Sequence, residues 1–383
     1  PVTTQVQIIH KCPYWELQTL DYKGNPKTVG GDEFYITYTD QALYQALVFT
    51  RTGTPPMLDP PFHTLPFTAA AWITDLNNGR YRLKFQASPL SMQSQRGRGI
   101  FAVYFHYTCN IGRMGPPSKE NWTDGGNSVA AYRTKILPLV PPIRPFQPPT
   151  STGNDGFGRP NLWNYDAIIP VGDSLLQNLL SPLRIEFKNV NSALNTSTLH
   201  NWKIFVRQAY RTYGGNGTNL VFVLGSCVWD VLEVQTVPTS TMDRTIGWLD
   251  HQKALRSLLQ SIWNRYPNAT FFWRSCSSVH LHVPHLANFT GLRLRGMQER
   301  TKYMSTSRAL QLYTIQKQII HEEMEAFQAF EKGDSRLFYL DVYSPYFLSA
   351  NHALAGDGRH YREEINREIV KWFVNDTLVR NDQ

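Results

Sequence analysis

The chain has 383 residues, of which 42% are hydrophobic and 18% are charged, so it can bury a core and is not expected to be intrinsically disordered. At ~100 to 200 residues per domain, this length predicts two domains, or at most three. The net charge is +8 at pH 7, but the basic residues are dispersed and carry no RNA-module signature, so no nucleic-acid partner is expected. No stretch approaches the ~18 to 20 consecutive apolar residues of a membrane span, so any anchor would lie outside this segment.

Several features indicate a secreted protein or one in the lumen of the secretory pathway. The chain begins at Pro1 without an initiator Met, as expected after removal of a signal or leader segment or from a trimmed chain. It also contains six Asn-x-Ser/Thr sequons, some of which chance alone could supply. Their asparagines, the predicted N-glycosylation sites, are Asn121, Asn195, Asn216, Asn268, Asn288 and Asn375.

The four cysteines fit two disulfides in an oxidising compartment, although four cysteines allow three pairings. We favour Cys12 with Cys109 and Cys227 with Cys276, because each pair then stays inside one expected domain. The alternative is that all four are unpaired core residues, since free cysteine is readily buried.

Residues 1–136 are typical of an all-β domain. Short runs of aromatic and β-branched residues are separated by turn residues, without a long helical period between them. The runs are Glu33–Tyr38, Ala46–Phe49, Tyr81–Phe85 and Ile100–Tyr107. Short strands at regular spacing predict a β-sandwich in which two sheets bury their facing sides.

A proline-rich linker is expected over residues 137–161. Six prolines occur between Leu137 and Pro149, where they remove backbone donors and favour extended conformations. The apolar residues among them indicate that this segment lies along a domain surface instead of swinging freely.

Residues 162–383 are typical of an α/β domain with a parallel sheet and helices on both faces. Buried strands are expected at Ala167–Val171, Leu220–Leu224, Phe271–Trp273 and Leu337–Val342. Helices are expected at Leu175 to about Phe187, Trp248–Tyr266, Ser307–Lys332 and Tyr361–Phe373. In such a domain a site should lie at the carboxyl ends of the strands.

The first of these strands runs into Gly172-Asp173-Ser174 and then into a helix. This places Ser174 at a helix N-terminus on the carboxyl edge of the sheet, where free backbone amides favour negative charge developing on a substrate oxygen. The simpler interpretation is that Ser174 only caps the helix, since capping is the commoner role for such a serine.

A second segment strengthens the catalytic hypothesis. Asp357 and His360 follow the last expected strand and precede the last helix. A histidine three residues after an aspartate can have its imidazole oriented by that carboxylate while it accepts a proton from a serine. Alone, the pair would more often be a cap and a surface residue. Together with Ser174, it predicts a Ser-His-Asp catalytic triad.

Together with three further segments, the Ser174 turn resembles a known family. The Ser174 turn, the segment Val223–Asp230, the strand Phe272–Ser275 and the closing Asp357–His360 resemble, in order, the blocks of the PC-esterase branch of the SGNH (GDSL-like) hydrolases. The N-terminal segments Gly30–Phe34 and Leu76–Leu83 resemble a filamin-type immunoglobulin repeat. This pairing of domains is similar to the neurexophilin and PC-esterase family, and the resemblance implies acyl-ester chemistry on glycans.

The resemblance also implies candidates for the oxyanion site and the pocket, which are Gly214, Gly225, Cys227, Trp229 and Arg274. One departure matters: Gly225 stands where the branch has an asparagine, so a polar side chain near the oxyanion site is missing. Loss of one such donor costs about 10²- to 10³-fold in rate. The remaining donors would be the Ser174 amide and a glycine of the Gly214-Gly215 loop.

Other candidates carry less weight. His280, His282 and His285 lie within six residues, but they lack an obvious fourth ligand and are expected to be exposed loop residues, so neither a metal nor another cofactor is expected. Trp229 and Trp273 lie near strand ends, where they could stack on a sugar or simply pack in the core.

The sequence therefore predicts a secreted or luminal O-acyl (acetyl) esterase or O-acetyltransferase that acts on glycans. In this hypothesis Ser174 attacks an acyl ester, His360 relays the proton and Asp357 orients the imidazole. The alternative is a catalytically inactive glycoprotein of the same fold that serves as a structural or glycan-binding component. In either case, the immunoglobulin-like domain is the expected site of protein contacts.

Overall fold

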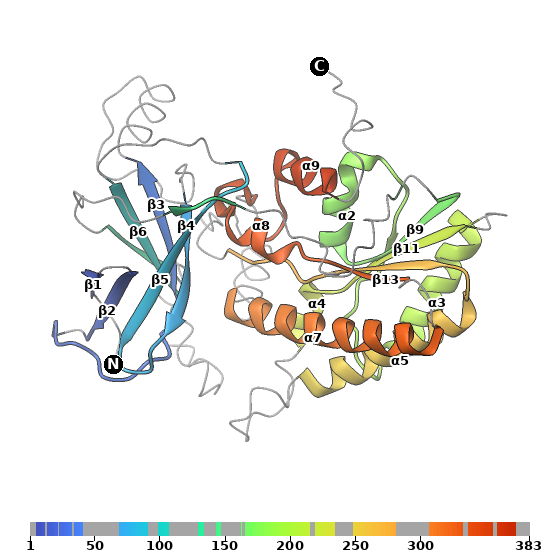
Figure 1. Ribbon diagram of the computed structural model, residues 1–383, viewed down its shortest axis with the longest axis horizontal. Coiled ribbons are helices and arrows are strands. Elements are labelled where there is room, and N and C mark those ends of the chain that lie inside the picture. Colours follow the sequence, from blue (N-terminus) through green and yellow to red (C-terminus); the bar gives the residue numbers. More distant parts are fainter. Residues whose placement is uncertain are drawn as a thin grey trace, which may run out of the picture. The chain divides into compact units, whose positions relative to one another are not determined.

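In the computed structural model the chain forms two compact units, and each unit is made of more than one stretch of sequence (Figure 1). The first contains Pro1–Gln147, His280–Lys302 and Phe347–Gly358, and the second contains Pro148–Val279, Tyr303–Tyr346 and Arg359–Gln383. The structure describes residues 5–11, 14–21, 23–32, 34–40, 69–90, 99–106, 129–133, 143–146, 162, 165–214, 219–233, 248–280, 306–331, 336–354 and 358–372.

The first unit is built on a β-sheet whose main strands are antiparallel, as the sequence predicted. The strands are β1 (Gln5–Lys11), β2 (Tyr14–Leu20), β3 (Phe34–Asp40), β4 (Ala69–Asp75), β5 (Arg80–Ala87), β6 (Gly99–His106), β7 (Val129–Arg133) and β8 (Ile143–Arg144). The first seven lie in the order β1-β2-β5-β4-β3-β6-β7. The expected run Ala46–Phe49 lies outside the described residues.

This order is immunoglobulin-like. The strands β1-β2-β5-β4 correspond to one sheet of the seven-stranded sandwich, and β3-β6-β7 correspond to the other. The expectation of two separate sheets is corrected, because β3 and β4 also pair, through Thr37 with Ala70 and Tyr38 with Ala69. The two halves are therefore joined into one hydrogen-bonded sheet among the described strands.

Alternating residues of four neighbouring strands form the core of the first unit. On β5, for example, Tyr81, Leu83 and Phe85 are buried while the residues between them are partly or fully exposed. The rest of this cluster is Trp15, Leu17, Ile36, Tyr38, Ala69 and Ala71.

The two N-terminal segments that carry the filamin-type resemblance lie against each other. The Gly31 amide donates to the Asp75 Oδ2 at 2.8 Å, and the Asp32 amide donates to the Tyr81 hydroxyl at 2.9 Å. Gly79, in the turn that follows Asp75, has a φ of +77°, which glycine adopts without strain.

Residues from late in the sequence complete the first unit. The Phe347 ring stacks on Trp72 with centroids 4.3 Å apart, and the Phe347 carbonyl accepts a 2.7 Å hydrogen bond from the Tyr35 hydroxyl. The hydroxyls of Ser88 and Ser349 lie 3.1 Å apart, within hydrogen-bond distance.

Part of the proline-rich segment follows the first unit's sheet. Strand β8 pairs in parallel with β5, through Ile143 with Phe85 and Arg144 with Gln86. These two residues of the expected linker are therefore part of the first unit's sheet.

The second unit contains the predicted parallel sheet. Its strands are β9 (Ala167–Gly172), β10 (Lys188–Asn189), β11 (Leu220–Gly225), β12 (Thr270–Arg274) and β13 (Leu337–Leu340). They lie in the order β10-β9-β11-β12-β13, and each pair of neighbours is parallel. This is the doubly wound order 2-1-3-4-5, in which ligands bind outside the carboxyl ends of the strands where the order reverses, here between β9 and β11.

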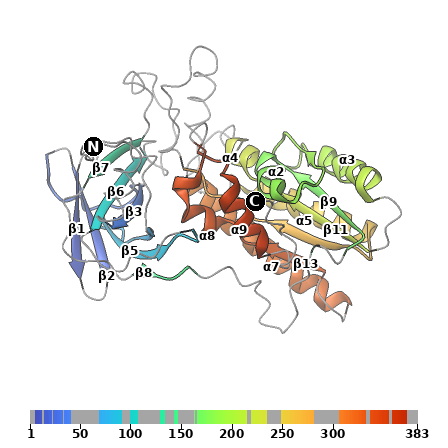
Figure 2. The same ribbon diagram turned by 90° about the horizontal axis from the view of Figure 1, so that it is seen from above.

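Helices cover both faces of this sheet, as predicted (Figures 1 and 2). Helices α3 (Leu199–Ala209), α5 (Leu249–Arg265) and α7 (Thr306–Glu331) pack on one face, where they bury alternate strand residues such as Val171, Phe222 and Trp273. Helices α2 (Ser174–Leu180) and α9 (Glu363–Lys371) lie on the other face. The short helices α4 (Val228–Glu233) and α8 (Tyr343–Phe347), like α3, were not predicted.

The helix expected from Leu175 to about Phe187 is shorter than the sequence suggested. It ends at Leu180 and is followed by a 3₁₀ turn, Ser181–Leu183, with Pro182 at its start. Arg184 then adopts a left-handed conformation with φ +53°, which reverses the chain toward β10.

Candidate active site

Ser174 lies at the point in the sheet where the strand order reverses. Strand β9 ends at Gly172, and α2 begins at Ser174. A Cβ at Gly172 would lie only 2.4 Å from the Gly225 carbonyl oxygen on the neighbouring strand, so this position requires glycine. The ends of β9 and β11 therefore lie close together two residues before the serine, where Gly172 pairs with Gly225.

Asp173, and not Ser174, caps helix α2. Its Oδ1 accepts hydrogen bonds from the Leu175 and Leu176 amides at 3.1 and 3.2 Å, and its Oδ2 accepts one from the Val228 amide at 2.9 Å. One buried carboxylate therefore ties the start of α2 to the start of α4. Because the cap is already provided, the interpretation of Ser174 as a capping residue is excluded.

The Ser174 hydroxyl instead faces the imidazole of His360. The two residues are 186 positions apart in the sequence, and the Ser174 Oγ lies 3.0 Å from the His360 Nε2. Both side chains are half-buried. With the ring proton on Nδ1, Nε2 is an acceptor for the serine hydroxyl, which is the geometry that general-base activation requires.

The third expected member of the triad, Asp357, lies outside the described residues. Its neighbour Gly358 has a φ of +65°, a conformation that suits glycine. The Gly358 amide donates to the Leu354 carbonyl at 2.9 Å, and the Gly358 carbonyl accepts from the His280 amide at 2.7 Å. The backbone next to Asp357 is therefore held in a defined conformation.

Arg274 is fully buried next to Asp173, the residue before Ser174. It ends β12, and its guanidinium Nη1 lies 3.9 Å from the Asp173 Oδ1 while Nη2 donates to the Ser277 hydroxyl. Burial lowers the pKa of the Arg274 guanidinium, and the Asp173 carboxylate opposes that shift. Arg274 therefore balances the charge of the carboxylate that caps α2.

The glycine at position 225 is explained by the same arginine. A Cβ at Gly225 would lie 3.1 to 3.3 Å from the Arg274 side chain and carbonyl oxygen. These distances are tighter than ordinary contact, so a Cβ at this position would require Arg274 to shift by a few tenths of an ångström. The missing side chain leaves space for Arg274.

Gly214 lies away from the serine. It ends the helical turn Tyr210–Gly214 that follows α3, where a Cβ would lie 3.0 Å from the Tyr210 ring and 3.4 Å from the Ile169 side chain. The chain then enters β11 at its amino end, where Leu220 pairs with Ala167. In a strand-helix-strand unit this return connection lies at the edge opposite the carboxyl ends, so the expected oxyanion role of Gly214 is corrected.

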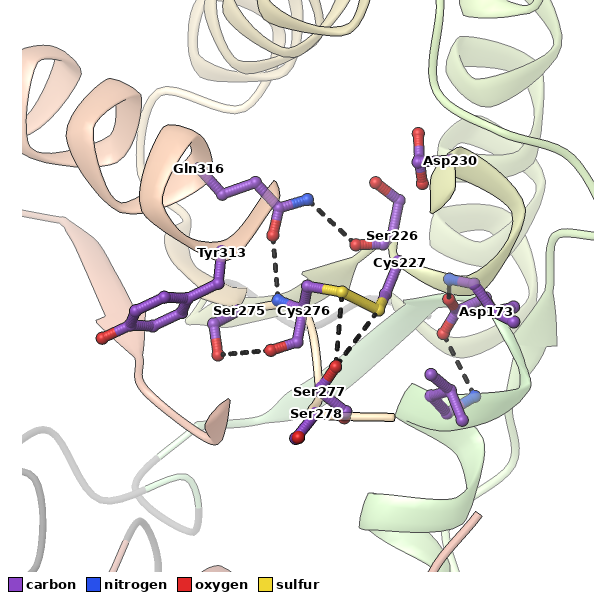
Figure 3. Close-up of a disulfide and its surroundings, with 12 residues drawn as sticks. Asp173, Ser226, Cys227, Asp230, Ser275, Cys276, Ser277, Ser278, Tyr313 and Gln316 are labelled. Atoms are coloured by element: carbon purple, nitrogen blue, oxygen red, sulfur yellow. Dashed lines mark hydrogen bonds between the residues drawn. A yellow bond between two sulfur atoms is a disulfide. The ribbon is translucent and has the colours of Figure 1, made fainter. Parts of the chain in front are cut away.

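The predicted disulfide between Cys227 and Cys276 is confirmed (Figure 3). The two cysteines follow the carboxyl ends of β11 and β12, and both are buried. The other predicted pair, Cys12 and Cys109, lies outside the described residues. The confirmed bridge therefore joins two loops at the edge of the sheet that carries Ser174.

Gln316 of α7 supports the same two loops (Figure 3). Its Oε1 accepts from the Cys276 amide at 2.9 Å, and its Nε2 donates to the Ser226 carbonyl at 3.0 Å. Behind it, the His251 Nδ1 lies 2.9 Å from the Asp230 Oδ1, and both of these side chains are buried. No local motif marks this network in the sequence, because its members come from separate helices and loops.

The remaining aromatic and histidine candidates are mostly structural. Trp273 is fully buried in the core of the second unit, whereas Trp229 is half-buried on α4.

The three histidine candidates are not an exposed cluster among the described residues. The expectation of an exposed His280 is wrong, because that ring is buried against Tyr35 at a centroid distance of 5.0 Å. His282 and His285 lie outside the described residues, and the described part of the chain contains no cluster of three or more side chains suited to a metal.

Two predicted glycosylation sites can be placed. Asn268 is exposed in the turn between α5 and β12. Asn195 is half-buried before α3, and its Oδ1 accepts a 2.9 Å hydrogen bond from the Thr198 amide. Asn121, Asn216, Asn288 and Asn375 lie outside the described residues.

None of the described helices is both long enough and apolar enough to cross a bilayer. In comparisons with known proteins, no family model and no curated protein matches the chain.

Proposed function

We propose that this chain is a secreted or luminal serine-dependent O-acyl esterase or acyltransferase that acts on acylated glycans. The observation that carries the proposal is the 3.0 Å distance between the Ser174 Oγ and the His360 Nε2, in a turn whose helix is already capped by Asp173. A serine that is not needed as a cap and that faces an imidazole is placed to act as a nucleophile.

The chemistry follows from these two side chains. The Ser174 Oγ attacks the acyl carbonyl carbon while its proton passes to the His360 Nε2, which gives a tetrahedral oxyanion. Collapse of this intermediate breaks the bond to the sugar oxygen, which takes the proton back from His360 and leaves an acyl-serine. Water or a second sugar hydroxyl then attacks the acyl-serine while its proton passes to His360. Collapse of this second intermediate breaks the bond to the Ser174 Oγ, which takes the proton back from His360, and releases the carboxylic acid or the acylated sugar. These steps need no cofactor.

The glycan substrate and the role of Asp357 rest on the resemblance to the PC-esterase branch of the SGNH hydrolases. The position of Ser174 at the carboxyl end of β9, where the strand order reverses, supports a ligand site there. The disulfide between Cys227 and Cys276 supports an oxidising compartment. In this proposal, the immunoglobulin-like unit supplies contacts to protein partners.

A catalytically silent glycoprotein is the alternative function, and one observation favours it. Gly225 offers no side-chain donor, and Gly214 lies at the wrong edge of the sheet to replace it. Oxyanion stabilisation then depends on backbone amides such as that of Ser174, so a slow enzyme or a glycan-binding scaffold becomes the competing expectation.

Acetate release tests the two functions. The parent and a Ser174→Ala variant are incubated with an O-acetylated oligosaccharide, with and without a non-acetylated acceptor. We expect the parent to release acetate or to acetylate the acceptor, and the variant to be at least about 10³-fold slower. Equal rates for the two proteins would favour the scaffold.

A further inference from the structure

The loop that carries His360 is attached to helix α2 through Asn178. Asn178 lies four residues after Ser174, so both side chains project from the same side of α2. The Asn178 Oδ1 accepts a hydrogen bond from the Tyr361 amide at 2.8 Å, and its Nδ2 donates to the Tyr361 carbonyl at 3.1 Å. Because Tyr361 directly follows His360, neighbouring turns of one helix hold the serine and the backbone beside the histidine.

The two bonds fix the orientation of the Asn178 amide. A backbone N–H can only donate and a backbone carbonyl can only accept, so the side-chain oxygen must face the Tyr361 amide and the side-chain nitrogen must face its carbonyl. Aspartate would keep the acceptor and lose the donor, whereas alanine would lose both. The site is therefore specific for the asparagine amide.

Further contacts keep Tyr361 itself in place. Asn366 of α9 donates from Nδ2 to the Asn178 carbonyl at 2.9 Å and to the Tyr361 carbonyl at 3.3 Å. The Tyr361 ring stacks on Tyr346 at a centroid distance of 3.9 Å, and its hydroxyl donates to the Ser278 carbonyl at 2.9 Å. Both the backbone and the ring of Tyr361 are held, so the backbone next to His360 has a fixed position relative to α2.

We propose that Asn178 is the positioning residue that sets the distance between the Ser174 hydroxyl and the His360 imidazole. This inference rests on the proposed function. Proton transfer requires a separation of ~2.6 to 3.2 Å, and a misplacement of ~1 Å costs about 10²-fold in rate. Asn178 contacts neither the Ser174 hydroxyl nor the His360 ring through any described bond, so it acts on the reaction through the backbone of the histidine loop.

A double-mutant cycle tests this role, with the rate of Ser174 labelling by a fluorophosphonate probe as the readout. Asn178→Ala should slow labelling about 10²-fold, because both hydrogen bonds to the Tyr361 backbone are lost. The matched control is Gln177→Ala, since Gln177 is the exposed neighbour on the same helix, and it should label at the parent rate.

The His360→Ala background separates positioning from general damage to the fold. There, Asn178→Ala should add no further loss, because no imidazole remains to be positioned. An equal further loss in that background, or no loss in the parent background, would overturn the proposal. An unlabelled parent would instead remove the proposed function, and with it any catalytic role for Asn178.

Hydrogen exchange at the Tyr361 amide tests the hydrogen bond between Asn178 and Tyr361 without depending on the reactivity of Ser174. Asn178→Ala should speed this exchange at least about 10-fold, because the amide loses its acceptor, while Gln177→Ala leaves it unchanged. Exchange at Ile369 on α9 should be the same in all three proteins, which shows that the helix stays folded. If exchange at the Tyr361 amide is unchanged in Asn178→Ala, Asn178 does not hold the histidine loop, even if the parent is labelled at Ser174.

Discussion

The Asp173 carboxylate and the Arg274 guanidinium lie 3.9 Å apart, and both side chains are buried. The carboxylate accepts from amides at the starts of α2 and α4, while the arginine comes from the end of β12. This pair therefore connects three carboxyl-end loops of the sheet. Removing one member of a buried ion pair leaves the other charge without compensation, which is costly.

Arg274→Met is expected to lower the free energy of unfolding by about 3 to 5 kcal/mol, because it leaves the Asp173 carboxylate buried and unpaired. The matched control is Arg367→Met on α9. Arg367 pairs with Glu363 on the same helix, and these side chains are 41% and 61% exposed, so its loss should cost no more than about 1 kcal/mol. Urea unfolding measures both effects. Equal losses in the two variants would contradict the structural role assigned to Arg274.

The disulfide is expected to stabilise the second unit. Replacing both Cys227 and Cys276 with serine should lower the free energy of unfolding by about 2 to 4 kcal/mol, since the closed loop spans 49 residues. Chemical unfolding of the parent, compared with the double variant under oxidising conditions, measures the difference. If both proteins have the same midpoint and slope, the bridge contributes no stability and its assigned role is wrong.

Asp341, at the end of β13, should make stability depend on pH. Burial raises the pKa of its carboxyl above the ordinary value of 3.8, although a 2.7 Å hydrogen bond from the Tyr313 hydroxyl opposes the shift. The folded state therefore holds this proton more tightly than the unfolded state. The contribution of Asp341 to stability is highest below pH 3.8 and falls as pH rises through the folded-state pKa.

Comparison with Asp341→Asn isolates this effect. The free energy of unfolding of the parent minus that of the variant should fall as pH rises above 3.8 and then level off. Tyr313→Phe removes the hydrogen bond that favours the ionised carboxylate, so in that variant the fall should extend to higher pH. A difference that stays constant across this range would show that Asp341 has no shifted pKa.

The sequence predicted those parts of the fold that depend on local pattern. Apolar runs such as Leu220–Leu224 indicated buried strands, and the Gly172-Asp173-Ser174 turn indicated the serine at a strand end, because both signals lie within a few neighbouring residues. Helix α4 was missed because it is short and follows its strand after only two residues, so its sequence was interpreted as part of the strand-end segment.

What local patterns cannot show is which polar groups meet across the chain. Asn178 and Tyr361 are 183 positions apart, and Gln316 is 90 positions from Ser226, so no motif connects them. The expectation that Gly214 lies near the oxyanion site was wrong for a related reason. A glycine-rich loop looks alike at either edge of a sheet, and only the direction of the chain through α3 and into β11 decides which edge it occupies.

Activation of Ser174 by His360 can be measured by site-resolved labelling with a fluorophosphonate. If the imidazole is the base, the parent is modified at Ser174 alone, Ser174→Ala is not modified at that position, and His360→Ala is labelled about 10²- to 10⁴-fold more slowly. A parent that does not react, or a His360→Ala variant that reacts as fast as the parent, would contradict that activation.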